Sequence, residues 1–170
     1  MSCCNKQLRN KCVIVYGIDP GLSGAIARFD LSEGFLEIHD MPIMEVNKKK
    51  AVSPQLVSDI LRQQHAPVYI EKVGAMPGQG VSSMFSFGRS YGVLLGCAAG
   101  LQMPTTVITP VEWQRALKCQ KGKDGNRQRA CELFPAYSQL FARKKDDGRA
   151  DASLLAYYGA LFVESVDYDG

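Results

Sequence analysis

The sequence has little of several residue types, and each shortage argues against a class of protein. It contains two histidines among 170 residues, which argues against a zinc site built on imidazole. Its longest apolar run, residues 93–101, falls far short of the roughly 20 residues that cross a bilayer. The first ten residues are polar and include no apolar core of a secretory signal. We therefore expect a protein with no membrane partner.

Cysteine is the exception, since six are present. Cys3 and Cys4 are adjacent and Cys97 lies in an apolar stretch. The six do not show the paired spacing of a metal site. We expect reduced thiols in the cytoplasm of a bacterial or phage-infected cell, with an organelle matrix as the alternative compartment.

With 46% hydrophobic residues, the chain is long enough to bury a sizeable core. No linker and no internal repeat divides it. We expect one domain over residues 1–170, with flexible ends at about 1–11 and 164–170.

The charge is unevenly distributed along the chain. The net charge is +3, yet residues 113–145 contain nine basic and two acidic residues. Such a basic segment favours a polyanionic partner, with a solvated surface as the alternative interpretation.

The order of apolar and turn-forming segments predicts an α/β protein. We expect three antiparallel strands, then helix–strand–helix–strand, then further helices. Residues 42–52, which include three consecutive lysines, are predicted to be a loop. The predicted strands are 13–18, 25–29, 35–39, 68–73 and 105–109, and the predicted helices are about 53–64, 83–101, 110–114, 127–134 and 148–163.

The longest predicted helix contains an unusual glycine repeat. Gly88, Gly92, Gly96 and Gly100 recur every four residues and so form one ridge. Each glycine costs up to about 1 kcal/mol relative to alanine inside a helix. Close packing on the sheet explains the repeat most simply, and a helix-to-helix contact in a dimer is the alternative.

Carboxylates follow two predicted strands and open the last predicted helix. Asp19 follows the apolar run 13–18, Glu71 follows Val68-Tyr69-Ile70, and Asp147 and Asp151 lie four residues apart. Neighbouring strands would bring Asp19 and Glu71 into one cleft, and a helical spacing of four would align the last two. Clustered carboxylates need a counter-charge.

Two hard divalent cations would supply that charge and would support phosphodiester hydrolysis. Oxygen-only ligation favours Mg²⁺ or Mn²⁺ over zinc, and no small-molecule cofactor is expected. Three of the acids also have a simpler explanation. Asp19 suits a turn before Pro-Gly, Asp147 suits a helix N-cap, and Asp151 benefits from the helix dipole in the first turn. Asp146 is interpreted as a solvated neighbour.

Three segments together resemble the RuvC-like Holliday junction resolvases, nearest their phage and chloroplast branch. These are Gly17-Ile18-Asp19-Pro20-Gly21, Tyr69-Ile70-Glu71-Lys72 and Gly148-Arg149-Ala150-Asp151-Ala152. The resemblance covers residues 13–161 and depends on the order and spacing of short motifs. It implies a ribonuclease-H-like fold with a five-stranded mixed sheet, three antiparallel strands followed by two parallel ones, flanked by helices.

The resemblance also implies a homodimer that makes paired, Mg²⁺-dependent nicks across four-way junction DNA and leaves 5′-phosphate ends. It assigns Asp19, Glu71 and Asp151 as metal ligands and Asp147 to the fourth position. Bacterial members generally space the last two acids by three residues. The chloroplast branch uses four, with histidine at the first position. The spacing of four here leaves Asp146 as an alternative fourth ligand.

The DNA-binding residues follow from the same resemblance and from the basic segment. Lys123 is expected near the scissile phosphate, as a catalytic residue. Met84, Phe85 and Phe87 are expected either to enter the junction centre and stack on bases, or to belong to the core. The expected phosphate-binding residues are Lys72, Lys121, Arg127, Lys144, Lys145 and Arg149.

Three alternatives remain at this point. Another ribonuclease-H-like nuclease, acting on flaps or RNA–DNA hybrids, would share the acids. A junction-binding module without catalysis would keep the fold and the basic segment. A sugar kinase or actin-like ATPase would share the Gly17–Gly21 motif, but those proteins need a duplicated domain for which this chain is too short.

Overall fold

The computed structural model describes residues 13–74, 78, 80–122 and 124–166, the last four of them by their backbone only. The expectation of flexible ends at residues 1–11 lies outside this range, and α5 continues through Val166. Among the described residues, no helix combines the length and the apolarity needed to cross a membrane.

A five-stranded sheet in the order β3-β2-β1-β6-β7 forms the centre of the molecule. β1 (Ile14–Asp19), β2 (Ala25–Asp30) and β3 (Phe35–Asp40) are antiparallel. β6 (Val68–Glu71) and β7 (Thr105–Ile108) extend the sheet in parallel to β1. The predicted mixed sheet, with three antiparallel and two parallel strands, is therefore confirmed.

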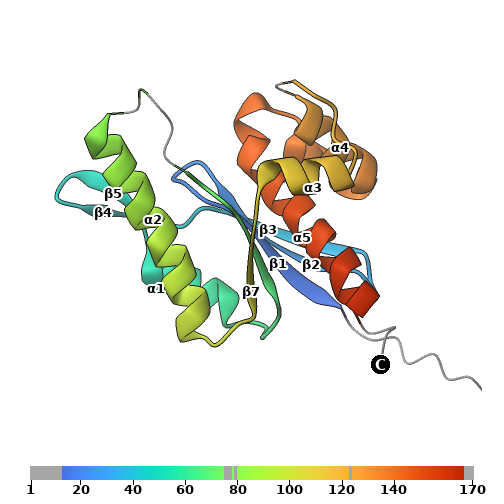
Figure 1. Ribbon diagram of the computed structural model, residues 1–170, viewed down its shortest axis with the longest axis horizontal. Helices are drawn as coiled ribbons and strands as arrows, with labels where there is room; N and C mark the ends of the chain where they lie inside the picture. The colour runs from blue at the N-terminus through green and yellow to red at the C-terminus, as the bar shows by residue number, and fades with distance from the viewer. Residues whose placement is uncertain (1–12, 75–77, 79, 123, 167–170) are drawn as a thin grey trace, which may run out of the picture.

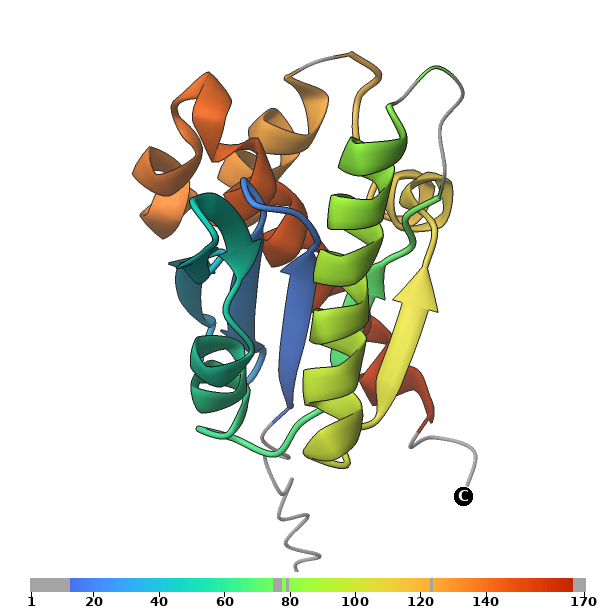
Figure 2. The ribbon, with the colours of Figure 1, turned by 90° about the vertical axis from the view of Figure 1, so that its left-hand side faces the viewer.

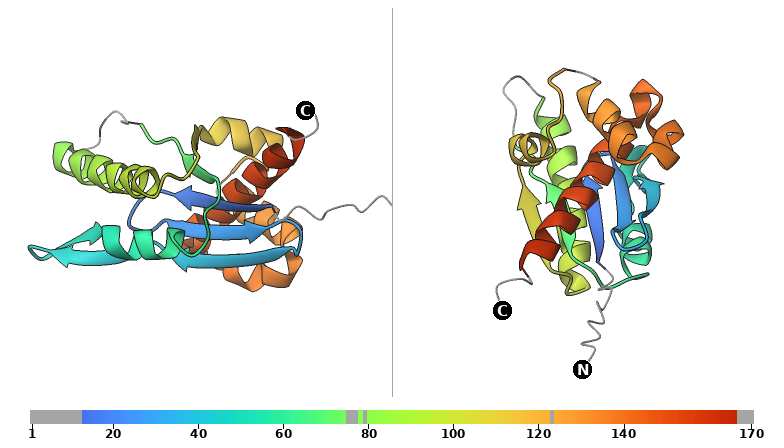
Figure 3. Two further views of the ribbon diagram at one scale, coloured as in Figure 1. Left: turned by 90° about the horizontal axis from the view of Figure 1, so that it is seen from below. Right: turned by 90° about the vertical axis from the view of Figure 1, so that its right-hand side faces the viewer.

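Helices cover both faces of this sheet (Figure 1). α1 (Pro54–Leu61) and α2 (Val81–Gly100) lie on one face, where α2 runs in front of the strands (Figure 2). On the other face, α5 (Asp147–Val166) crosses the strands (Figure 3). The elements beside α5 are α3 (Pro110–Ala116), α4 (Gly125–Leu133) and two 3-10 helices, η1 (Pro135–Phe141) and η2 (Lys144–Asp146).

Strand alternation divides the core into two layers. Tyr16 and Ile18 of β1 pack with Leu61 of α1 and Leu94 of α2. Val15, one residue away, belongs to the layer under α5. Side chains at odd positions of β1, including Asp19 at its end, therefore face α5.

Two glycines allow α5 to lie directly on the sheet. A Cβ atom at Gly17 would lie 2.1 Å from the Ala152 carbonyl oxygen and 2.3 Å from the Ala156 amide nitrogen. A Cβ atom at Gly159 would lie 2.4 Å from the Tyr69 ring. Any larger residue at either position would push the helix outward, so these glycines set its height above β1 and β6.

Residues 42–52 differ from the prediction of a loop. They form a hairpin of β4 (Ile43–Val46) and β5 (Lys49–Val52). The turn consists of Asn47 and Lys48, whose φ angles are 51° and 62°. A two-residue hairpin turn of type I′ requires a positive φ at both positions, and lysine is not a residue usually found there, so the sequence did not indicate the turn.

The expectation that the glycine ridge packs on the sheet is also wrong. Gly88, Gly92, Gly96 and Gly100 are exposed, and a Cβ atom at any of them would meet no heavy atom of the described residues within 4 Å. Leu94 and Ala98, on the opposite side of α2, are the residues buried against the sheet. The ridge is a bare outer surface.

Candidate active site

Four carboxylates from three elements meet at one end of the sheet. Asp19 is the last residue of β1 and Glu71 the last of β6, and these strands pair in parallel with Ile18 opposite Ile70. Tyr69 contacts Gly159 of α5, and Glu71, two residues further along the strand, points to the same face. Asp147 and Asp151 occupy the first two turns of α5, which lies on that face.

The start of α5 is in contact with the Asp19 carboxylate. A Cβ atom at Gly148 would lie 3.0 Å from Asp19 Oδ2 and 2.5 Å from the Ser23 carbonyl oxygen. Asp147 has helical backbone angles, with φ −53° and ψ −47°. Asp147 and Asp151 therefore lie one above the other on α5, as the spacing of four predicts for two helical residues. Asp147 is not an N-cap, because an N-cap residue has non-helical angles.

Mutual repulsion and burial make this group of acids costly to ionise. Burial, with the charges of Asp151, Glu71 and Asp147 next in importance, raises the pKa of Asp19 to about 8. Burial likewise raises the pKa of Asp151 to about 7, with Glu71 and Asp147 adding to the effect. The pKa of Glu71 is also raised by burial. The site thus favours a positive counter-charge at neutral pH.

Polar groups from the neighbouring helices hold three of the acids in place. The indole nitrogen of Trp113 in α3 donates to Glu71 Oε2 at 3.0 Å. Asn126 of α4 donates to Asp151 Oδ1 at 2.8 Å. Arg127 Nε lies 2.7 Å from Asp147 Oδ1, and the same side chain contacts Asp124. Each acid is therefore oriented by a different partner.

The four acids do not form a closed cage. Among the described residues, no three histidine, cysteine, aspartate or glutamate side chains are close enough to hold a metal ion as they stand. Trp113, Asn126 and Arg127 each contact one carboxylate oxygen of the site. The donor set itself consists of carboxylate oxygens, which suit a hard cation such as Mg²⁺.

Asp146 has a different environment from the one expected. It was interpreted as a solvated neighbour, but only 2% of it is exposed. Arg143 donates to Asp146 from its backbone nitrogen, Nε and Nη2 at 2.9, 3.0 and 2.9 Å. Both carboxylate oxygens are engaged, and Arg143 holds the pKa of Asp146 below its usual range. The geometry favours Asp147 over Asp146 as the fourth acid of the site.

The expected DNA-binding residues fall into two groups. Lys72, Lys121, Lys144 and Lys145 are exposed and make no ion pair within the part of the chain that the structure describes. Arg127 is occupied by Asp124 and Asp147, and Arg149 by Asp40. Lys123 lies outside the described residues.

The aromatic residues at the start of α2 also differ in exposure. Phe85 is 73% exposed, whereas Met84 and Phe87 are partly buried. Phe87 lies over the turn that follows Asp19, where its ring would be 3.3 Å from a Cβ atom at Gly21. Phe85 is therefore the residue free to contact a partner, and Phe87 supports the turn.

A groove that the sequence did not predict opens beside the Asp19 turn. Its volume is about 660 Å³. It runs between the turn at residues 20–23, the β4–β5 hairpin and the start of α2, and Lys49 and Lys50 line it together with Ser82, Ser83, Ser86 and Ser90. The lysine triplet in the sequence was the only sign of it.

Comparison with solved structures identifies the fold. Two structures of RuvC from Thermus thermophilus, one in complex with a Holliday junction substrate, superpose with TM-scores of 0.62 and 0.60, each at 15% identity. They cover 90% and 91% of this chain, and 96% and 97% of RuvC. The fold is that of RuvC. It is therefore ribonuclease-H-like, as the sequence predicts.

Two further comparisons bear on this RuvC-like chain. The yeast mitochondrial Holliday junction resolvase Ydc2 superposes with a TM-score of 0.53 at 16% identity, over 93% of this chain and 82% of Ydc2. The chloroplastic Holliday junction resolvase MOC1 of Chlamydomonas reinhardtii is 34% identical over 92 residues, 52% of this chain. Those residues are 10% of the length of MOC1. No family model matches the sequence.

Proposed function

We propose that this RuvC-like chain is a Holliday junction resolvase, an endonuclease that makes paired, symmetric nicks in four-way DNA junctions. The observation that carries the proposal is the meeting of Asp19, Glu71, Asp147 and Asp151 at one end of a RuvC-type sheet. The sequence similarity to MOC1 supports the same substrate.

The four acids fit two Mg²⁺ ions, with Mn²⁺ as a substitute, because they offer only hard oxygen donors in a partly buried site. Asp19, Glu71, Asp147 and Asp151 would hold the ions. Bound there, the ions would supply an activated water and stabilise the leaving oxygen. On the resemblance to the resolvases, we propose that the products carry 5′-phosphate and 3′-hydroxyl ends.

The protein's own side chains keep the acids in order for this task. Trp113 and Asn126 each donate one hydrogen bond to a carboxylate, leaving its remaining lone pairs for a cation. Arg127 occupies Asp147, so binding of a cation at Asp147 requires that this contact be exchanged. Such partners set the orientation of ligand side chains and thereby tune affinity.

The basic surface supports a polyanionic partner. Lys72, Lys121, Lys144 and Lys145 are exposed, and Lys49 and Lys50 line the groove beside the Asp19 turn. We infer that these lysines contact phosphates of the junction arms. Phe85, exposed at the start of α2, is our candidate for stacking on a base at the junction centre. Lys123 is proposed, on the resemblance alone, to lie near the scissile phosphate.

We infer a homodimer that forms through α2. Paired nicks require two active sites in a fixed, two-fold relation. The exposed ridge of Gly88, Gly92, Gly96 and Gly100 offers a bare helix surface on which a second copy of α2 can approach closely. The cost of four glycines in one helix is explained if that approach is their role.

The cysteines of the described residues support a proposal for the compartment. Cys97, Cys119 and Cys131 are free thiols. Free thiols are typical of a reducing compartment. We infer the cytoplasm, or the matrix of an organelle, as the site of action.

The deciding experiment is incubation with a synthetic mobile four-way junction beside linear duplex, flap and RNA–DNA hybrid substrates. We expect symmetric nicks in the junction alone, abolished by EDTA and restored by Mg²⁺. Asp19→Asn should bind the junction and not cleave it. Cleavage of flaps or hybrids would favour a different ribonuclease-H-like nuclease. Junction binding without cleavage in any divalent cation would favour a binding module.

A further inference from the structure

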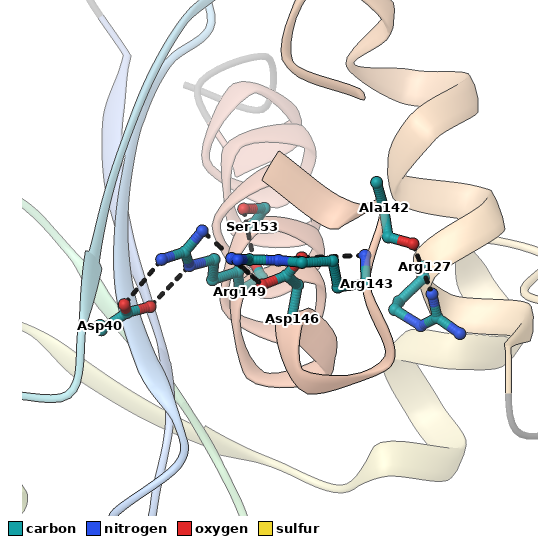
Figure 4. A network of polar contacts seen from close by, with 7 residues as sticks. All are labelled: Asp40, Arg127, Ala142, Arg143, Asp146, Arg149 and Ser153. Atoms are coloured by element: carbon teal, nitrogen blue, oxygen red, sulfur yellow. Dashed lines mark hydrogen bonds and ion pairs between the residues drawn. The ribbon is translucent and has the colours of Figure 1, made fainter. Parts of the chain in front are cut away.

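A line of alternating charges joins the edge of the sheet to the first turn of α5 (Figure 4). Arg149 Nε and Nη2 donate to Asp40 Oδ1 and Oδ2 at 2.6 and 2.7 Å. Arg149 Nη1 lies 3.7 Å from Asp146 Oδ1. Asp146 in turn accepts three hydrogen bonds from Arg143. Asp40, Arg149, Asp146 and Arg143 form one connected network, which we call the Asp40–Arg143 network.

The position of this network relates it to the candidate active site. Arg149 lies between Asp147 and Asp151 on α5. Asp40 ends β3 and pairs in register with Ala25, which in turn pairs with Asp19. The network thus begins at the end of β3, two strands from Asp19, and passes through Asp146, the residue before Asp147.

The network lies at the end of α5 that presents the acids. The first two turns of α5 contain Asp147 and Asp151, and the backbone at Gly148 lies against the Asp19 carboxylate and the Ser23 carbonyl oxygen. The position of this end of α5 therefore sets the distance of both acids from Asp19. Arg149 is fixed to Asp40 in a two-pronged arrangement, the geometry that gives an arginine–carboxylate pair its directional strength. The buried Asp146 fastens the other end, since each of its oxygens is bonded.

We propose that Asp40 and Asp146, acting through Arg149, are positioning residues that hold Asp147 and Asp151 in place for divalent-cation binding. The proposal rests on the proposed function, because it assumes that the four acids are the cation site. It also reassigns Arg149, expected from the sequence to bind DNA phosphates, to a role within the protein.

Asp40→Asn is the primary test, because Asp40 is 66% exposed and its replacement leaves the core intact. The probe is Mn²⁺ alone, titrated into the full chain without DNA and followed by calorimetry. Removal of such an orienting partner typically costs 10- to 100-fold in metal affinity, and we expect about a tenfold loss. Junction affinity in EDTA should stay within about twofold of the parent chain, and Asp40→Glu should regain part of the lost Mn²⁺ affinity.

Glu37→Gln is the matched control. Glu37 lies on the same strand and forms the same kind of pair, with Arg28 Nη2 at 2.9 Å, but it is not part of the network. The Glu37→Gln variant should bind Mn²⁺ with the same affinity as the parent chain. Equal Mn²⁺ affinity in Asp40→Asn and the parent would overturn the positioning role, as would an equal loss in Glu37→Gln.

The outcomes separate this proposal from the proposed function. If the parent chain binds Mn²⁺ but leaves junctions intact, resolution is wrong, while the comparison of variants still decides the role of Asp40. If the parent cleaves junctions and Asp40→Asn binds Mn²⁺ normally, only the positioning role fails. A parent chain that binds no Mn²⁺ contradicts both.

Discussion

Trp113 donates its indole N–H to Glu71 across 3.0 Å, from the helix that follows β7 to the end of β6. Trp113 is fully buried, so this hydrogen bond is shielded from water. It lowers the pKa of Glu71, opposing the larger effect of burial, which raises it. The only tryptophan of the chain therefore contacts one of the four acids of the candidate active site directly.

Trp113→Phe should consequently raise the pKa of Glu71 further. The acidic limb of the pH–rate profile for junction cleavage should move to higher pH, with a loss of about tenfold at pH 6 and a smaller loss at pH 9. Tyr137→Phe is the control, since its hydroxyl accepts from the Leu36 amide, remote from the acids. If the rate of junction cleavage falls by the same factor at every pH, the proposed effect of Trp113 on the pKa of Glu71 is wrong.

The stability of the metal-free protein should fall as the pH rises. The pKa of Asp19 is about 8 in the folded chain, against an ordinary value of 3.8. The folded state therefore holds a proton that the unfolded state releases, and the stabilisation is present at low pH and lost as the pH passes through about 8. Asp151, with a pKa of about 7, acts in the same direction.

The side chain that Asp19→Asn introduces cannot ionise. The substitution should therefore remove most of the dependence of the free energy of unfolding on pH. In EDTA at pH 8 we expect it to raise the free energy of unfolding by about 2 kcal/mol, and by less at pH 5. Urea denaturation at the two pH values measures this. The surface variant Asp59→Asn should unfold like the parent, and an unchanged slope in Asp19→Asn would argue against a buried, strained acid.

The exposed lysines should govern the salt dependence of DNA binding. Replacing Lys144 and Lys145 together by alanine should reduce the slope of log affinity against log salt by about 2, because each phosphate contact contributes about 0.9. Fluorescence anisotropy with labelled junction in EDTA gives the slope. Arg62→Ala, which removes an exposed positive charge at the C-cap of α1, should leave the slope unchanged. If the double variant has the same slope as the parent chain, Lys144 and Lys145 do not contact DNA phosphates.

The glycine ridge should determine the oligomeric state. A long charged side chain, as in Gly92→Arg or Gly96→Arg, should prevent α2 from meeting its copy and yield a monomer by light scattering, with unchanged circular dichroism. Such monomers should lose paired nicking. Gln55→Arg on α1 adds the same charge to another exposed helix and should remain dimeric. A parent chain that is monomeric at micromolar concentration would remove the basis for this inference.

Much of the fold was accessible from sequence, because its strands are short apolar runs ending at turns. The β4–β5 hairpin was missed, since its strands are partly exposed and its Asn47–Lys48 turn lacks glycine. The glycine repeat led to a wrong prediction, that the ridge on α2 packs against the sheet. The conspicuous ridge on α2 faces outward, while the close approach to the sheet depends on Gly17 and Gly159, which no repeat marks.

Local sequence patterns were enough to predict the five strands of the main sheet and to place Asp19, Glu71, Asp147 and Asp151 at the ends of strands or at the start of a helix. Strand and helix periodicities are local properties, and they are written in neighbouring residues. Which charged side chains are free for a partner depends on long-range packing, which local patterns do not contain. Asp40 and Arg149, 109 residues apart, pair because the sheet edge and α5 pack together, and that contact turns Arg149 and Asp146 toward the protein rather than toward a partner.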